Sequence, residues 1–246
     1  KVSRLNKILD FSLFSQEYFG NLYRMDNNNF YYYYKIYIEK ISNIFRNVGI
    51  NINTAPVLDV LSSKTHDSIG DRSYSENVDS VSKIGLICTK LFAEYKIGTV
   101  IKHIPGLGQA EVDSHYKLPI IKTSKNNLIK RDFKPFKKLN SQFAMTAHAV
   151  YKSYDPNFVA THSRIIIEKI IRKHIGFEGI LISDDISMKA LRYDIKKNTT
   201  NALDAGCNLV LHCNGNIKEM TKLVKIVPKI DKFTLKKTSQ FYNFLR

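Results

Sequence analysis

Cysteine is scarce in this chain. The 246 residues include three cysteines, Cys88, Cys207 and Cys213, which are widely separated along the sequence. Three scattered cysteines are too few for a disulfide framework, and their spacing is not that of a zinc site. The scarcity favours a reducing compartment, and we expect the chain to be cytoplasmic.

Long hydrophobic runs are also missing. No stretch of 18 apolar residues occurs, so we expect no transmembrane helix and no membrane partner. The first residues, Lys1–Asn6, have neither the apolar core nor the cleavage site expected of a signal peptide. With 43% hydrophobic and 24% charged residues, the composition is typical of a globular protein. The length suits one large domain or two small ones.

Acidic residues are outnumbered, and the net charge is +16. Such a balance can indicate nucleic-acid binding, which requires a clustered basic patch. Here Lys and Arg are spread along the chain, and the densest group, between Lys130 and Lys138, falls on an expected helix. We therefore favour a solvated helix face and expect no nucleic-acid partner. The alternative, a basic nucleic-acid-binding protein, predicts steeply salt-dependent binding.

The first fifty residues predict helices alone. Apolar positions at helical spacing indicate helices over 12–25 and 30–48, with a turn at 26–29 between them. Gly49 is the expected C-cap of the second helix.

Strands and helices alternate through the rest of the chain. Five apolar runs are typical of buried strands: 55–59, 98–103, 143–147, 179–183 and 207–213. Helices are expected over 77–95, 124–139, 163–175 and 189–205 and from about 217 onward. Continuous apolar strands alternating with helices predict a parallel sheet with helices on its faces.

Each expected strand ends near a polar or ionisable side chain. These are Asp59, His103, His148, Asp184 and His212. In a (β/α) barrel the functional groups collect at the carboxyl ends of the strands, whereas an open doubly wound sheet binds mainly at one switch point. The pattern predicts an α/β fold of the (β/α)8 TIM-barrel type. Because five strands do not close such a barrel, either it is incomplete, with about five C-terminal β/α units present, or the sheet is open.

One long loop concentrates chemistry-bearing residues. Lys102 and His103 end a strand and are followed by Pro105-Gly106-Leu107-Gly108, which breaks regular structure. Asp113 and His115 follow in the same loop, and Asp184 lies 69 positions after His115 at another strand exit. An imidazole with its own carboxylate and a second carboxylate at a strand end form a plausible acid/base and nucleophile set.

These segments occur together in a known family. They are APVLDV (55–60), GDRSY (70–74), KHIPGLG (102–108), DSH (113–115), MTAHAVY (145–151), GFEGILISDDISM (176–188) and DAGCNLVLHCN (204–214). In order and spacing the chain resembles the bacterial β-N-acetylhexosaminidases of glycoside hydrolase family 3, cytoplasmic enzymes of peptidoglycan recycling. The resemblance covers nearly the whole chain.

The resemblance implies a catalytic set. Retaining glycosidases need a nucleophilic carboxylate and a proton donor for the leaving oxygen. Asp184 matches the family's nucleophile, His115 its acid/base and Asp113 the partner that orients the imidazole. Asp185 is expected to point elsewhere and to hold the turn. The alternative is that Asp184 and Asp185 both cap a following helix.

The resemblance also implies sugar-binding residues. The matching positions are Lys102, His103, Arg72 and Arg4. Ammonium and imidazole donors suit the hydroxyl and acetamido oxygens of N-acetylglucosamine, although a Lys-His pair can equally lie on the surface. Asp59 and His148 are expected to give supporting hydrogen bonds.

The chain departs from the family pattern in two places. Leu107 stands where the family commonly has His, so we expect a polar contact near the sugar to be lost. Lys1–Arg4 resembles the residues just after a VDQEGG segment on the family's third strand. By this reading, residues 1–246 form a single barrel domain truncated at its N-terminus. It would begin roughly 65 residues late, at about 30 per unit, and would lack three strands and a substrate-binding Asp.

The expected function is a retaining β-N-acetylglucosaminidase. It would remove terminal non-reducing N-acetyl-D-hexosamine from muropeptides, GlcNAc linked to 1,6-anhydro-N-acetylmuramic acid, as a monomer. We expect no metal and no cofactor, since no metal-ligand cluster or phosphate-binding glycine loop occurs. Water or phosphate remains open as the acceptor. The alternative is a truncated remnant that is inactive or only binds sugar.

Overall fold

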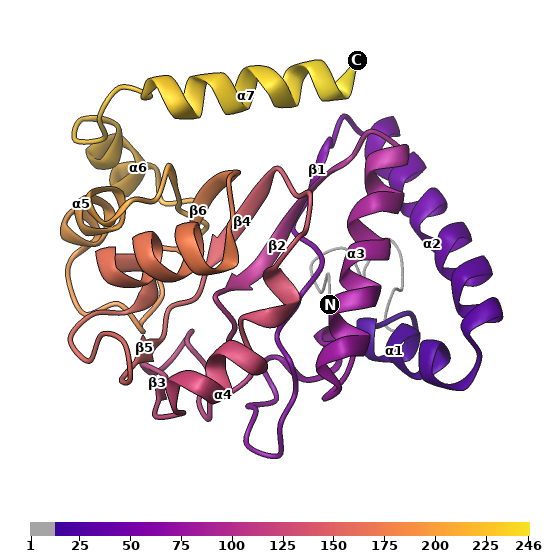
Figure 1. Cartoon of the computed structure of the whole chain (residues 1–246). Helices are drawn as coiled ribbons and strands as arrows, with labels where there is room; N and C mark the ends of the chain where they lie inside the picture. Colours follow the sequence, from indigo (N-terminus) through magenta and orange to yellow (C-terminus); the bar gives the residue numbers. More distant parts are fainter. Residues whose placement is uncertain (1–12) are drawn as a thin grey trace.

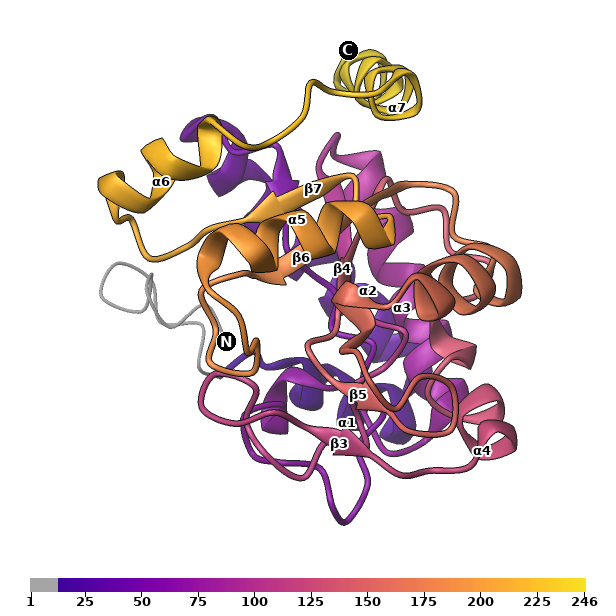
Figure 2. The same ribbon diagram turned by 90° about the vertical axis from the view of Figure 1, so that its left-hand side faces the viewer.

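A computed structural model describes residues 13–246, and its centre is a parallel sheet. Within these residues the sheet has five strands in the order β1-β2-β4-β6-β7, each parallel to its neighbour. Their bounds are β1 (Ile52–Asn53), β2 (Gly98–Ile104), β4 (Phe143–Thr146), β6 (Ile180–Asp185) and β7 (Leu209–Leu211). The strands curve into a half-barrel with helices on the outside (Figures 1 and 2), which confirms the predicted fold class.

Helices join the strands. The longer ones are α1 (Gln16–Met25), α2 (Asn27–Asn47), α3 (Val78–Glu94), η4 (Ile166–Ile175), α5 (Ile195–Ala205), α6 (Ile217–Val224) and α7 (Lys232–Leu245). The short ones are η1 (Gly70–Arg72), α4 (Lys125–Lys130), η2 (Lys134–Phe136) and η3 (Ala160–His162). A separate parallel pair, β3 (Ile120–Ile121) with β5 (Val150–Tyr151), joins two loops.

The predicted turn at 26–29 is wrong. The Asp26 carboxylate accepts the backbone N–H groups of Asn28 and Asn29, each at 3.0 Å, and so caps α2. The asparagines that suggested a turn therefore form the first turn of α2, because the cap satisfies N–H groups that a helix start leaves unpaired.

Two other expected helices are shorter than predicted. The helix expected over 124–139 ends at Lys130, and η2 follows with Pro135 inside it, since proline lacks the N–H that a continuing helix needs. The helix expected over 189–205 begins only at Ile195, where Asp194 accepts the N–H groups of Lys196 and Lys197.

The strand expected over 55–59 is displaced. β1 ends at Asn53, and the chain beyond it continues alongside β2 through isolated contacts. Leu58 N–H donates to the Lys102 carbonyl at 2.7 Å, and Lys102 N–H donates to the Pro56 carbonyl at 3.1 Å. These bonds still bring Asp59 to the carboxyl end of the sheet.

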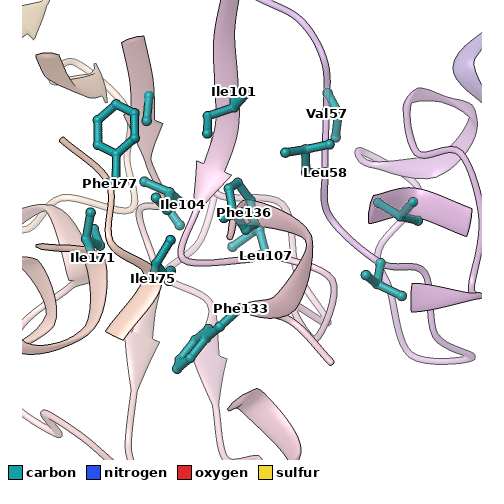
Figure 3. Close-up of a cluster of buried hydrophobic side chains, with 14 of the residues drawn as sticks. Val57, Leu58, Ile101, Ile104, Leu107, Phe133, Phe136, Ile171, Ile175 and Phe177 are labelled. Atoms are coloured by element: carbon teal, nitrogen blue, oxygen red, sulfur yellow. The ribbon is translucent and has the colours of Figure 1, made fainter. Parts of the chain in front are cut away.

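Apolar packing covers both faces of the sheet. One face presents Ile101, Ala144 and Leu181, all with 0% exposure, to a core shared with α3 and η4, part of which Figure 3 shows. On the other face Phe143 packs with Phe241 of α7, which lies across the amino ends of the strands (Figure 1). Burial of these side chains is the main force that holds the helices to the sheet. Among the described helices, none has both the length and the apolar character needed to cross a bilayer.

Candidate active site

Four ionisable side chains meet at the carboxyl ends of the central strands: Asp59, His103, His148 and Asp184. His103 and Asp184 belong to β2 and β6, which flank β4 in the sheet. His103 Nε2 lies 4.0 Å from Asp184 Oδ2. The convergence expected for a parallel barrel sheet is therefore present.

Asp59 fixes the orientation of His103. Its carboxylate has 0% exposure and accepts the Nδ1–H of His103 at 2.7 Å. It also accepts the backbone N–H groups of His103 at 3.2 Å and of Leu107 at 2.6 Å. Because a carboxylate can only accept here, Nδ1 carries the proton and Nε2 faces Asp184. The supporting role expected of Asp59 is confirmed.

His148 supports the turn after β6. Its Nε2–H donates to the Asp185 carbonyl at 3.0 Å, so its Nδ1 accepts from the Thr161 hydroxyl at 2.7 Å. The Thr146 hydroxyl lies 2.7 Å from that of Thr161 and completes the chain of bonds. Burial lowers the pKa of His148, although Asp184 and the Asp185 carbonyl oppose the shift. His148 thus braces the turn, and its expected supporting hydrogen bonds are confirmed. Thr161, in the short helix η3, was missed because no sequence signal marks it.

Asp184 is held as an anion. Burial raises the pKa of its carboxyl, but His103, His148, the Asp185 N–H and Lys102 together outweigh burial and leave the pKa below its ordinary value. The Asp184 side chain keeps 20% exposure, so substrate can reach it. A charged, accessible carboxylate at a strand end is suited to nucleophilic attack.

Lys102 stands next to this anion. Burial lowers the pKa of Lys102, and the neighbouring Arg72 lowers it further, whereas Asp184 and Asp59 raise it. Arg72 is held in η1 by donating from Nε and Nη2 to the Ser68 carbonyl at 2.9 and 2.6 Å. Of the expected sugar-binding cations, Lys102 therefore lies near Asp184, and Arg72 lies near Lys102. Arg4, the fourth expected position, lies outside the described residues.

Asp185 turns away from this group. Its carboxylate accepts the N–H of Ser187 at 3.0 Å and that of Cys213 at 3.2 Å, as expected of a residue that holds the turn. The alternative in which Asp184 and Asp185 cap a helix is wrong, because α5 begins at Ile195 and is capped by Asp194.

The glycines of the loop after β2 are required by close backbone contacts. A Cβ atom at Gly108 would lie 1.9 Å from the Val60 carbonyl oxygen, and one at Gly106, where φ is +130°, would lie 2.5 Å from the Asp132 carbonyl oxygen. Leu107 between them has 5% exposure and belongs to the buried apolar cluster of which Figure 3 shows a part. The expected loss of a polar contact near the sugar stays a prediction, and the Leu107 side chain itself lies in the apolar core.

His115 and Asp113 form the expected pair farther along the loop. His115 Nδ1 lies 2.8 Å from Asp113 Oδ1, and the imidazole is 61% exposed. Burial raises the pKa of Asp113, but hydrogen bonds from the His115 backbone and ring outweigh it, and the net shift is downward. Nδ1 therefore carries the proton, and Nε2 can exchange protons with a bound molecule.

This loop reaches the turn that follows Asp184. The Ser114 carbonyl accepts the backbone N–H of Ala190 at 3.2 Å, and Lys189 Nζ lies 5.8 Å from the centre of the Tyr116 ring. His115 and Asp184 therefore lie at the same end of the sheet. Within residues 13–246, no three or more His, Cys, Asp and Glu side chains are grouped so that they could hold a metal ion.

Comparison with known proteins places this arrangement in a family. Residues 25–238 match the family described as glycosyl hydrolase family 3 N terminal domain. A β-hexosaminidase from Shewanella frigidimarina is 36% identical over 174 residues, which are 68% of this chain and 50% of that protein. One from Idiomarina loihiensis is 34% identical over 171 residues, 68% of this chain and 51% of that protein.

Solved structures give the same result. NagZ from Neisseria gonorrhoeae, in complex with N-trifluoroacetyl-D-glucosamine, has a TM-score of 0.82 and 26% identity, covering 94% of this chain and 67% of that one. A β-N-acetylglucosaminidase from Thermotoga maritima has a TM-score of 0.71 and 28% identity, covering 92% and 50%. The chain spans about half the length of the two β-hexosaminidases.

Proposed function

The chain belongs to glycosyl hydrolase family 3, and we propose that it is a retaining β-N-acetylhexosaminidase with Asp184 as its nucleophile. The observation that carries the proposal is the Asp184 carboxylate, ionised and accessible at the end of β6 beside His103 and Lys102. The β-hexosaminidase relatives support the reaction class.

In the first step the glycosidic bond is exchanged for a bond to the protein. A carboxylate oxygen of Asp184 attacks the anomeric carbon, and the bond from that carbon to the leaving oxygen breaks. His115, protonated at Nε2, gives this proton to the leaving oxygen, while Asp113 stabilises the imidazolium through Nδ1–H. An imidazole donor avoids placing a second carboxylate near the nucleophile.

In the second step water releases the sugar. Neutral His115 takes a proton from water, the water oxygen attacks the anomeric carbon, and the Asp184 carboxylate departs. Two inversions at one carbon leave the β configuration unchanged. Phosphate could replace water as acceptor, and the product would then be the sugar phosphate.

The sugar-binding part of the proposal rests on the donors beside Asp184. Lys102 offers N–H groups to the hydroxyl and acetamido oxygens of an N-acetyl sugar, His103 Nε2 can accept a hydrogen bond from a sugar hydroxyl, and Arg72 adds positive charge beside Lys102. The Neisseria protein named above was solved with an N-acylated glucosamine. The finer proposal is a cytoplasmic monomer that acts on muropeptides, supported by the family resemblance of its motifs and by the scarcity of cysteine.

The test is hydrolysis of 4-nitrophenyl N-acetyl-β-D-glucosaminide. We expect turnover with initial release of the β-anomer, seen by proton NMR, and loss of roughly 10⁴-fold in kcat for Asp184→Asn. The exposed Asp204 provides the control, since Asp204→Asn should leave kcat unchanged. Release of the α-anomer would reject retention, and full activity of Asp184→Asn would reject the nucleophile. Sugar binding without turnover would favour a sugar-binding protein.

A further inference from the structure

Asp132 is a buried carboxyl group without hydrogen-bond partners. Its side chain has 0% exposure, and within the described residues neither of its oxygens has a partner. Other buried aspartates differ: Asp59 accepts three N–H groups, and Asp155 accepts from Asn157, Phe158 and Ser163. A buried anion without donors is strongly disfavoured, so Asp132 requires its own explanation.

Asp132 lies against the turn that carries His103. A Cβ atom at Gly106 would be 2.9 Å from the Cβ of Asp132. The Tyr151 hydroxyl donates to the Gly106 carbonyl at 2.6 Å and braces the same turn. Asp59 accepts N–H groups at His103 and Leu107, as described above. The turn from His103 to Leu107 is therefore in contact with two buried carboxyl groups: Asp59 accepts three N–H groups, whereas Asp132 accepts none from any other described residue.

The surrounding charges favour the neutral form of Asp132. Burial raises the pKa of Asp132 to about 7 and Asp59 adds to this shift, whereas Arg131 and the backbone N–H of Asp132 itself oppose it. Burial raises the pKa of the Tyr151 hydroxyl, and the neighbouring carboxyl groups of Asp132 and Asp59 raise it further. Among the described residues Arg131 makes no direct bond to Asp132: its Nη2 donates to the Leu61 carbonyl, and its Nε has no partner.

We propose that Asp132 is a positioning residue that is kept as a neutral carboxylic acid, and that its ionisation displaces the His103–Leu107 turn and moves the His103 imidazole away from Asp184. On ionisation the carboxyl proton passes to a base in the solvent, and no other covalent bond is formed or broken. Repulsion from Asp59 and the need of the new anion for water drive the displacement. The effect on catalysis rests on the proposed function, whereas the effect on the turn does not.

Direct titration tests the neutral form without any substitution. In protein carrying ¹³C in the aspartate carboxyl groups, the Asp132 signal should titrate with a midpoint near pH 7, and the His103 ring signals should shift over the same range. A midpoint below pH 4, or His103 signals that do not follow Asp132, would overturn the proposal.

Asp132→Asn tests the consequence for stability. The unfolded chain releases this proton near pH 4, whereas the folded protein keeps it to about pH 7, so the wild type loses stability as pH rises through this window. The Tm of Asp132→Asn minus that of the wild type should therefore increase by roughly 5–10 °C between pH 4 and pH 7 and then level off. Asp155→Asn, which removes a well-partnered carboxylate, should give no such increase. A constant difference for Asp132→Asn would reject the proposal.

The same variant tests the consequence for catalysis. Above pH 7 the wild type should lose kcat/KM faster than Asp132→Asn, so that their ratio changes by roughly tenfold between pH 6.5 and 8.5. Parallel profiles in two active proteins would overturn the positioning role. If neither protein hydrolyses the substrate, the proposed function fails, and the titration and Tm measurements still decide the state of Asp132.

Discussion

At the scale of single residues, the site is a set of charges that set one another's protonation. Lys102 helps to lower the pKa of Asp184, and Asp184 in turn raises that of Lys102 against the lowering by burial. Such mutual shifts are typical of functional sites, where burial strengthens each interaction. A change at one member should therefore be visible in the titration of the other.

Lys102→Met should affect both binding and the acid limb of activity. Loss of a charged donor costs about 1.5–3 kcal/mol, which corresponds to a fall in kcat/KM of roughly 10- to 150-fold. Loss of the positive charge should also raise the pKa of Asp184, so the acid limb of the kcat/KM profile should move to higher pH. An unmoved acid limb would show that Lys102 does not act on Asp184. The exposed Lys196 is a suitable control, because Lys196→Met should change neither quantity.

Thr161→Val should loosen the brace under the β6 turn. The substitution keeps the shape but leaves His148 Nδ1 buried without its donor, which costs about 1–3 kcal/mol of unfolding free energy. Urea denaturation measures the loss. Thr200→Val, at an exposed hydroxyl, should stay within about 0.5 kcal/mol of the wild type. Equal effects at the two positions would contradict the role assigned to Thr161.

At the scale of elements, periodic apolar segments were predicted well. The helix expected over 77–95 is α3 (Val78–Glu94), and the strand expected over 98–103 is β2 (Gly98–Ile104). The errors lie where one side chain decides the backbone path. Asp26 caps α2, whose first residues, three asparagines, led to the prediction of a turn. Pro135 interrupts a helix that the apolar spacing would continue. The local sequence pattern does not indicate whether such contacts form, because their strength depends on the surrounding fold.

The sequence predicted the residues at the strand ends, but only some of the hydrogen bonds between them. Strand ends pointed to Asp59, His103, His148, Asp184 and His212, since parallel strands present their carboxyl ends at one edge. The first four meet, whereas His212 Nε2 bonds the Glu219 carboxylate at 2.8 Å. The bond from Asp59 to His103 joins residues 44 positions apart, and no sequence spacing indicates it. The unpartnered state of Asp132 likewise becomes visible only when the chain is folded.

Gly108→Ala tests the fit of the loop after β2. The added Cβ would overlap the Val60 carbonyl, so the backbone must shift, at a cost of about 3 kcal/mol in unfolding free energy and with weaker sugar binding. Gly49→Ala is the matched control: φ is +76°, but nothing lies within 4 Å, and only the backbone conformation is penalised, by about 1 kcal/mol. Denaturant titration of both variants measures the difference. A smaller loss at Gly108 than at Gly49 would contradict the close contact.

At the scale of the whole molecule, the two ends of the sheet have different tasks. The carboxyl ends carry the candidate site, and the amino ends are covered by α7 (Figure 1), whose Phe241 packs on Phe143. This division is the usual one in barrel folds, where the amino-terminal face serves stability. Substitutions in α7 should therefore change stability and leave the chemistry intact.

Phe241→Ala should cost about 3–5 kcal/mol, because it removes a buried aromatic side chain and leaves a cavity. KM and kcat should be unchanged below the unfolding temperature. Tyr242→Ala, at a neighbouring residue with 66% exposure, should change Tm little. Thermal unfolding with activity assays at 20 °C distinguishes the two. A loss of kcat in folded Phe241→Ala would contradict this separation of tasks.

The bond from Ala190 N–H to the Ser114 carbonyl has a consequence for motion. Ser114 directly precedes the imidazole of His115, and Ala190 belongs to the short turn that begins just beyond Asp184. Because of this bond, thermal motion of either segment tends to move the other in the same direction. The distance between the His115 imidazole and the Asp184 carboxylate should therefore vary less than that between two independently moving surface loops. The proton donor and the nucleophile thus belong to segments that one backbone hydrogen bond couples.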